Sequence, residues 1–182
     1  MEPLIDLSLT VNGGEVSARV PARQTLVDFL RYGLELTGSH VGCEHGSCGA
    51  CTVRLDGDIV RGCLVLAAQA DGAHVETIEG LSDSGEVADL QAVFHTRNAL
   101  QCGYCTPGML LTAQALLAAN PAPSREEIRI YLSGNYCRCT GYHAIVDAIE
   151  SVAASRRAGE SVPASRRAGE STSAERREGA AS

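Results

Sequence analysis

The chain has 182 residues, a formal net charge of −7 and 45% hydrophobic residues. These values exclude a largely disordered chain, allow one ordinary domain or two small ones, and argue against nucleic acid as a partner. No apolar run approaches the roughly 18 residues that a spanning helix needs, so we expect no membrane span.

The first part of the chain predicts a small sheet that packs on one helix. Residues 4–11 and 16–20 alternate apolar and polar side chains, and the Asn12-Gly13-Gly14 turn between them makes a hairpin. Thr25 can cap a helix that follows. Further strands are expected at residues 52–55, at 58–61 and near 75–77. Together these elements predict an α+β domain over residues 1–80.

From about residue 84 the apolar period becomes helical, which predicts a second domain over residues 84–153. Thr106-Pro107 is typical of a helix start, and Ser124 with Glu127 forms a capping box. Four amphipathic helices of modest length indicate a small bundle. Residues 154–182 repeat an Ala-Ser-Arg-Arg-Ala-Gly-Glu-Ser unit, a composition that predicts a disordered tail.

Eight cysteines form two sets of four, one in each predicted domain. Because the first residues carry no basic segment of the kind that starts a secretory signal, we expect a reducing, cytoplasmic location in which cysteines serve metal or redox chemistry. The first set has the C-x4-C-x2-C…C spacing of plant-type [2Fe–2S] ferredoxins. Its members are Cys43, Cys48, Cys51 and Cys63.

Glycines within the first set would let the backbone wrap closely around an anionic cluster and point N–H groups at its sulfurs. A structural zinc site is the alternative, although zinc ribbons prefer C-x2-C pairs. His45 lies inside this loop, and with four cysteines available we expect it to be a bystander or a hydrogen-bond donor.

The second set consists of two short motifs far apart in the sequence. It comprises Cys102, Cys105, Cys137 and Cys139. We expect a helix to start immediately after each motif, so that two positive helix ends favour thiolates at one site. Taken alone, this set is only moderately specific for iron–sulfur over zinc.

Three segments together resemble the iron–sulfur subunit of the xanthine oxidase, or molybdenum hydroxylase, family. They are Gly42-Cys-Glu-His-Gly-Ser-Cys-Gly-Ala-Cys51, Gln101-Cys-Gly-Tyr-Cys-Thr-Pro-Gly108 and Gly134-Asn-Tyr-Cys-Arg-Cys-Thr-Gly-Tyr142. The resemblance covers roughly residues 4–153. It implies a β-grasp ferredoxin domain followed by a four-helix bundle, each with one [2Fe–2S] cluster.

The resemblance also implies an electron-transfer role within a larger enzyme. Electrons would pass from a molybdopterin cofactor on a large subunit, through the cluster held by the second cysteine set, to the cluster of the first set and then to FAD on a medium subunit. Gln101 and Cys139 match positions that lie against the pterin. A dimer of heterotrimers is expected.

Two other functions stay open from the sequence: a stand-alone [2Fe–2S] electron carrier and a two-zinc interaction scaffold. The residues do not identify the substrate of the whole enzyme among N-heterocycles, purines, aldehydes and carbon monoxide, nor the final electron acceptor. The chain lacks a nucleophile–base pair and a dinucleotide fingerprint, so we expect it to transfer electrons and to leave the substrate chemistry to a partner.

Overall fold

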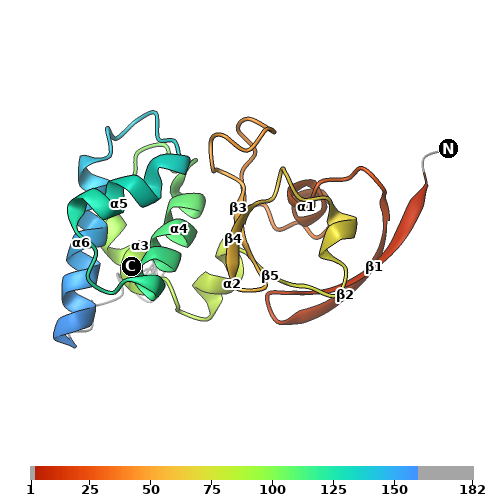
Figure 1. Cartoon of the computed structure of the whole chain (residues 1–182), viewed down its shortest axis with the longest axis horizontal. Coiled ribbons are helices and arrows are strands. Elements are labelled where there is room, and N and C mark those ends of the chain that lie inside the picture. Colours follow the sequence, from red (N-terminus) through yellow and green to blue (C-terminus); the bar gives the residue numbers. More distant parts are fainter. Residues whose placement is uncertain (1–2, 160–182) are drawn as a thin grey trace, which may run out of the picture.

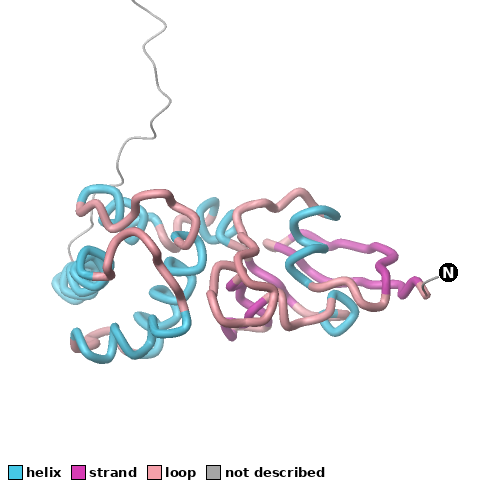
Figure 2. The backbone as a smooth tube through the Cα atoms, turned by 90° about the horizontal axis from the view of Figure 1, so that it is seen from above, coloured by secondary structure: helices cyan, strands magenta, loops and turns pink. Residues whose placement is uncertain are grey.

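The computed structural model describes residues 3–159, which form two lobes side by side along the longest axis (Figure 1). The strands lie in one lobe, and most of the helical segments lie in the other (Figure 2). Each lobe has its own buried apolar core, as expected of two small structural units. No helix within residues 3–159 combines the length and the apolar character needed to cross a membrane.

The strand lobe is built on a five-stranded sheet in the order β2-β1-β5-β3-β4. β1 pairs with β5 in parallel, and the other neighbours are antiparallel. The strands span Leu4–Val11 (β1), Gly14–Pro21 (β2), Thr52–Leu55 (β3), Asp58–Arg61 (β4) and His74–Glu76 (β5). The expected hairpins are confirmed, and the last strand begins one residue earlier than predicted.

A short helical segment packs on this sheet. It consists of α1 (Leu26–Asp28) and a single wider turn, η1 (Phe29–Gly33), and the Thr25 hydroxyl accepts a bond from the Asp28 N–H as predicted. Leu26 and Leu30 are fully buried against the sheet. A 3-10 turn, η2 (Ala67–Ala70), completes the lobe.

The helical lobe contains five α-helices within the described residues. They are α2 (Ile78–Asp83), α3 (Ala88–Thr96), α4 (Thr106–Ala119), α5 (Arg125–Tyr131) and α6 (His143–Ala158), with a 3-10 turn η3 (Leu132–Gly134) after α5. Thr106 starts α4, and Ser124 forms a capping box with Glu127 at the start of α5, both as predicted. The prediction of four helices missed α2, whose short sequence carries no clear helical period.

The expected boundary at residue 154 is wrong for the next five residues, because α6 continues to Ala158 and ends at Gly159 in a left-handed conformation. Alanine and arginine favour a helix, and Val152 and Ala153 are still buried against the lobe. The helix α6 therefore continues past residue 153 into the first copy of the repeat. The rest of the predicted tail, residues 160–182, lies outside the described residues.

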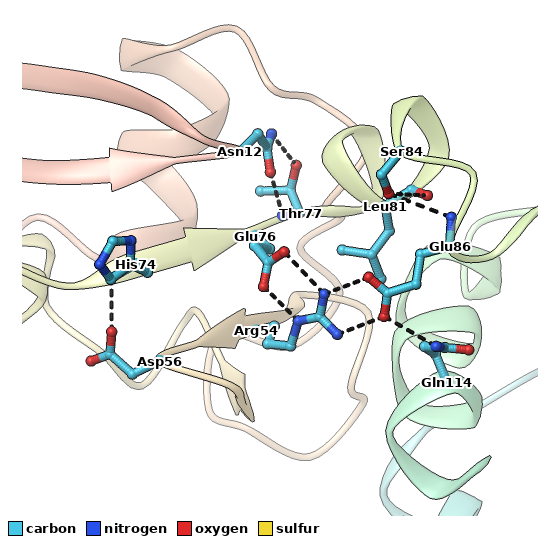
Figure 3. A network of polar contacts seen from close by, with 10 residues as sticks. All are labelled: Asn12, Arg54, Asp56, His74, Glu76, Thr77, Leu81, Ser84, Glu86 and Gln114. Atoms are coloured by element: carbon cyan, nitrogen blue, oxygen red, sulfur yellow. Dashed lines mark hydrogen bonds and ion pairs between the residues drawn. The ribbon is translucent and has the colours of Figure 1, made fainter. Parts of the chain in front are cut away.

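The two lobes meet along α4, which lies against β3 and β4. Arg54 on β3 occupies the centre of this boundary, with Glu76 on one side and Glu86 on the other (Figure 3). Glu86 also accepts a hydrogen bond from Gln114 on α4 at 3.0 Å. Charged groups that are fully hydrogen-bonded in this way fix the lobes relative to each other.

Candidate metal centres

The first cysteine set lies at the edge of the strand lobe that faces the helices. Cys43, Cys48 and Cys51 come from the loop between η1 and β3, and Cys63 follows β4. Cys51 and Cys63 are buried with Val27, whereas Cys43 and Cys48 are half-buried. The structure thus places Cys51 beside Cys63 and Cys48 beside Cys43.

Glycines in this loop allow neighbouring side chains to pack directly against its backbone. Gly46 has φ +84°, and a Cβ placed there would stand 2.4 Å from the Leu64 side chain. Leu64 is itself 62% exposed, so it covers the loop from outside. A larger residue at position 46 would have to displace this cover, in addition to its backbone strain.

The loop gives its thiols very different acidities before any metal is bound. N–H groups of Cys48 and His45 point at the Cys43 sulfur and lower its pKa to about 6, and the Cys48 N–H lies 3.4 Å from that sulfur. Burial raises the pKa of Cys51 to about 12. A metal must therefore displace the Cys51 proton, while the N–H groups around Cys43 are already suited to a thiolate.

The second cysteine set is gathered on the helical lobe from two distant segments. Cys105 caps α4 and precedes Thr106, as expected, but α6 begins at His143, so three residues separate Cys139 from that helix. The expectation of an immediate helix start is wrong there. A turn intervenes, and it ends at Tyr142 in a left-handed conformation, with φ +69°.

Thiol acidity also differs within the second set. Burial raises the pKa of Cys105 to about 12. Burial opposes ionisation of Cys137 as well, but the hydroxyl of Thr140, at 3.0 Å from the sulfur, and the Thr140 N–H, at 3.4 Å, outweigh it and lower the pKa. Both sets therefore combine buried thiols with thiols that accept backbone N–H bonds.

In each set the thiols lie close together in pairs. The Cys102 and Cys139 sulfurs are 3.6 Å apart, and the thiols of Cys105 and Cys137 interact with each other. Within residues 3–159, no three His, Cys, Asp or Glu side chains converge as ligands of one metal ion do. Two neighbouring pairs of thiolates are the donor set that a two-iron cluster takes, with two thiolates for each iron.

The two residues predicted to lie near a pterin are adjacent on the surface. Gln101 is exposed and donates a 3.1 Å bond from its side-chain amide to the carbonyl oxygen of Cys139. Cys102 and Cys139 are the two exposed cysteines. His45, expected to be a bystander or a hydrogen-bond donor, is exposed, and its ring contacts the carbonyl of Cys43.

One backbone hydrogen bond joins the two cysteine loops directly. The N–H of Tyr136, next to Cys137, donates to the carbonyl oxygen of Cys48 at 2.8 Å. Both loops lie along the same upper edge of the molecule in Figure 1. A cysteine of one set and the neighbour of a cysteine of the other are thus in contact through a single hydrogen bond.

The sequence did not indicate a second contact between these loops. The rings of His40 and Tyr104 stack with centroids 4.4 Å apart, the His40 ring bonds the Tyr104 carbonyl at 2.7 Å, and the Tyr104 hydroxyl donates to Val41 at 2.8 Å. The position of Tyr104 between two cysteines was the only available signal, and it suggested local packing alone.

Comparison with known families assigns each lobe to an iron–sulfur family. Residues 9–78 match the family described as "2Fe-2S iron-sulfur cluster binding domain", and residues 77–150 match "[2Fe-2S] binding domain". The two matches meet at residues 77 and 78, where α2 begins. Two lobes, each matched to an iron–sulfur family and each holding four cysteines, define a protein with two [2Fe–2S] centres.

Curated relatives and a solved structure narrow the class. The chain is 51% identical to caffeine dehydrogenase subunit gamma of Pseudomonas sp. (strain CBB1), covering 81% of this chain and 90% of that protein. It is 52% identical to nicotine 6-hydroxylase small subunit of Paenarthrobacter nicotinovorans, covering 80% and 87%. A chain of quinoline 2-oxidoreductase from Pseudomonas putida 86 superposes with a TM-score of 0.80 at 51% identity, covering 87% of this chain and 99% of that one.

The chain belongs to the iron–sulfur small subunits of the molybdenum hydroxylase, or xanthine oxidase, family. It is the electron-transfer subunit of a multi-subunit oxidoreductase and contains two [2Fe–2S]-binding domains. The resemblance stated from the three motifs is confirmed.

Proposed function

We propose that the two cysteine sets each hold one [2Fe–2S] cluster and that electrons pass between them along the loop contact. Bound clusters of this kind each take up and release one electron at a time. In this proposal Cys43, Cys48, Cys51 and Cys63 hold one cluster, and Cys102, Cys105, Cys137 and Cys139 hold the other. The strand lobe is the β-grasp domain, and the helical lobe is the bundle domain.

The observation that carries this proposal is the 2.8 Å bond from the Tyr136 N–H to the Cys48 carbonyl. It joins the backbone of one ligand residue to the backbone next to another ligand, Cys137. A route made of covalent bonds and one hydrogen bond is continuous, so it leaves no solvent gap between the two sets.

The exposure of the second set indicates which partner it faces. Cys102 and Cys139 are exposed, and Gln101 bonds the Cys139 carbonyl. We assign this surface to a large subunit that carries a molybdopterin cofactor, with Gln101 and Cys139 toward the pterin. The first set then faces a medium subunit that carries FAD. The chain itself supplies the thiolate ligands and the hydrogen bonds around them and takes no part in substrate chemistry.

The substrate of the whole enzyme is proposed from the relatives. Two are named for caffeine and nicotine, and the similar solved structure is a quinoline oxidoreductase. All three names refer to N-heterocyclic aromatic compounds, and we propose this substrate class. The complex, purified with its partners, should reduce an artificial electron acceptor with such heterocycles and not with simple aldehydes. Turnover of aldehydes alone would contradict the substrate class.

Assembly and location form a further part of the proposal. We propose a dimer of heterotrimers in the cytoplasm. The eight cysteines are proposed as cluster ligands, a role typical of cysteines in a reducing compartment. Light scattering of the purified complex tests the assembly, since a mass that corresponds to one small subunit alone would identify a stand-alone carrier.

The test of the cluster assignment is iron and sulfide analysis combined with electron paramagnetic resonance (EPR) of the reduced complex. Two [2Fe–2S] clusters require about four irons and four sulfides per chain. Cys51→Ser should remove one cluster signal and Cys105→Ser the other, with the remaining signal unchanged in each case. Zinc in either site, or one signal lost in both variants, would overturn the assignment.

A further inference from the structure

Asn135 is a buried polar residue at the meeting point of the two lobes. It is 1% exposed, and its amide nitrogen donates to the carbonyl of Gly49, between Cys48 and Cys51, at 3.1 Å. Its side-chain oxygen accepts from Thr112 on α4 at 3.0 Å and from Arg61 on β4 at 3.4 Å. An amide satisfied on both sides in this way favours one arrangement of the elements around it.

The backbone around this amide is packed as closely as glycine allows. A Cβ at Gly49 would lie 2.4 Å from the Gly134 carbonyl, and one at Gly108 would lie 2.3 Å from the Gly49 carbonyl. Arg61 also donates to the Gly134 carbonyl at 2.8 Å. The cysteine loop of the strand lobe is thus wedged between α4 and the segment that leads to Cys137.

The backbone of Asn135 is held from the helical side as well. The Tyr142 hydroxyl donates to the Asn135 carbonyl at 3.1 Å and accepts the N–H of Cys137 at 2.8 Å. Tyr136 lies between these two anchored residues. The Asn135 carbonyl and the Tyr136 N–H belong to one planar peptide unit, so this N–H cannot turn away from the Cys48 carbonyl without breaking the bond from Tyr142.

We propose that Asn135 is a positioning residue for electron transfer between the two clusters. Its side chain fixes the strand-lobe loop at Gly49 while its backbone is fixed by Tyr142, and this holds the Tyr136 N–H on the Cys48 carbonyl. The inference rests on the proposed function, because it assigns a role in transfer between the two cysteine sets. In this proposal Asn135 itself does not bind either cluster.

The decisive variant is Asn135→Asp, tested in the full complex. The aspartate has nearly the same shape but presents an oxygen to the Gly49 carbonyl in place of the donor, so the bond is lost and the two oxygens repel. With both clusters reduced, their spin–spin splitting in the EPR spectrum should shrink or disappear. Hydrogen exchange of the peptide that contains Tyr136 should accelerate by about tenfold, the effect of losing one buried hydrogen bond.

Two matched variants separate positioning from general destabilisation. Thr112→Val removes one bond to the Asn135 oxygen and keeps the donor to Gly49, so the splitting should stay close to that of the parent. Asn120→Ala removes a side chain at the far end of α4, bonded to Glu127, and should change neither readout.

The outcomes distinguish this inference from the proposed function. An Asn135→Asp complex with about four irons per chain and an unchanged splitting would overturn the positioning role and leave the cluster assignment intact. If Asn135→Asp loses a cluster, Asn135→Gln is used, since it keeps the donor but misplaces it, and an unchanged splitting there overturns the inference equally. A parent complex without two iron–sulfur signals would instead overturn the proposed function.

Discussion

Arg54 and Glu86 are joined across the lobe boundary by two hydrogen bonds of 2.8 Å each (Figure 3). The same guanidinium forms a second two-bond contact with Glu76 in its own lobe, at 2.7 and 3.0 Å. Two carboxylates on one arginine place excess negative charge there, and the partial burial of Arg54 strengthens both contacts. Ion pairs therefore hold the two lobes together at this boundary, in addition to the packing.

Glu86→Gln should destabilise the protein by about 1 to 2 kcal/mol, because it keeps the shape and replaces a charge-assisted contact with a neutral one. Thermal unfolding of the complex and of the isolated chain measures the loss. Asp6→Asn is the matched control, since the Asp6–Arg19 pair is exposed on both sides and should cost less than about 0.5 kcal/mol. Equal losses in the two variants would contradict the role of the boundary pair.

We also expect the stabilising contribution of Glu86 to depend on pH. Hydrogen bonds from Arg54 lower the pKa of Glu86, so its contribution is complete above the ordinary carboxyl pKa and is lost as pH falls through the lowered value. The stability difference between the parent and Glu86→Gln should be constant from pH 7 to about 5 and shrink below about 4.3. A difference that persists unchanged to pH 3, or grows on acidification, would contradict this assignment.

Spacing within short segments made much of this structure predictable. The Asn12 turn and the Ser124 capping box depend on neighbours a few residues apart, and the fold places them as expected. The contacts that join the lobes could not be predicted. Asn135 and Gly49 are 86 residues apart, and a single asparagine or glycine gives no periodic signal. Short α2 was missed for the same reason, since six residues carry less than two turns of period.

The stacked pair of His40 and Tyr104 should contribute to the stability of both cysteine loops. Tyr104→Leu loses the ring contact and the bond to Val41, whereas Tyr104→Phe loses only the bond. A double-mutant cycle with His40→Ala and Tyr104→Ala should give a coupling energy of about 0.5 to 1.5 kcal/mol. Tyr32→Phe, at a ring 74% exposed, is the control and should leave stability unchanged. Zero coupling would show that the stacked rings contribute nothing beyond their separate contacts.

Gly49→Ala tests whether close approach at the lobe boundary is required. Gly49 has φ +73° and an added Cβ would meet backbone at 2.4 Å, whereas Gly57 has φ +94° with nothing within 4 Å. Both substitutions therefore cost about 1 to 2 kcal/mol of backbone strain, and only Gly49→Ala adds a steric conflict with the Gly134 carbonyl. We expect Gly57→Ala to keep both clusters with a modestly lower unfolding temperature. Gly49→Ala should shift the two loops apart and reduce the spin–spin splitting between the reduced clusters, since the Cys48 carbonyl moves with its neighbour. Identical behaviour of the two variants would mean that the loops tolerate a wider spacing and that contact at Gly49 does not set it.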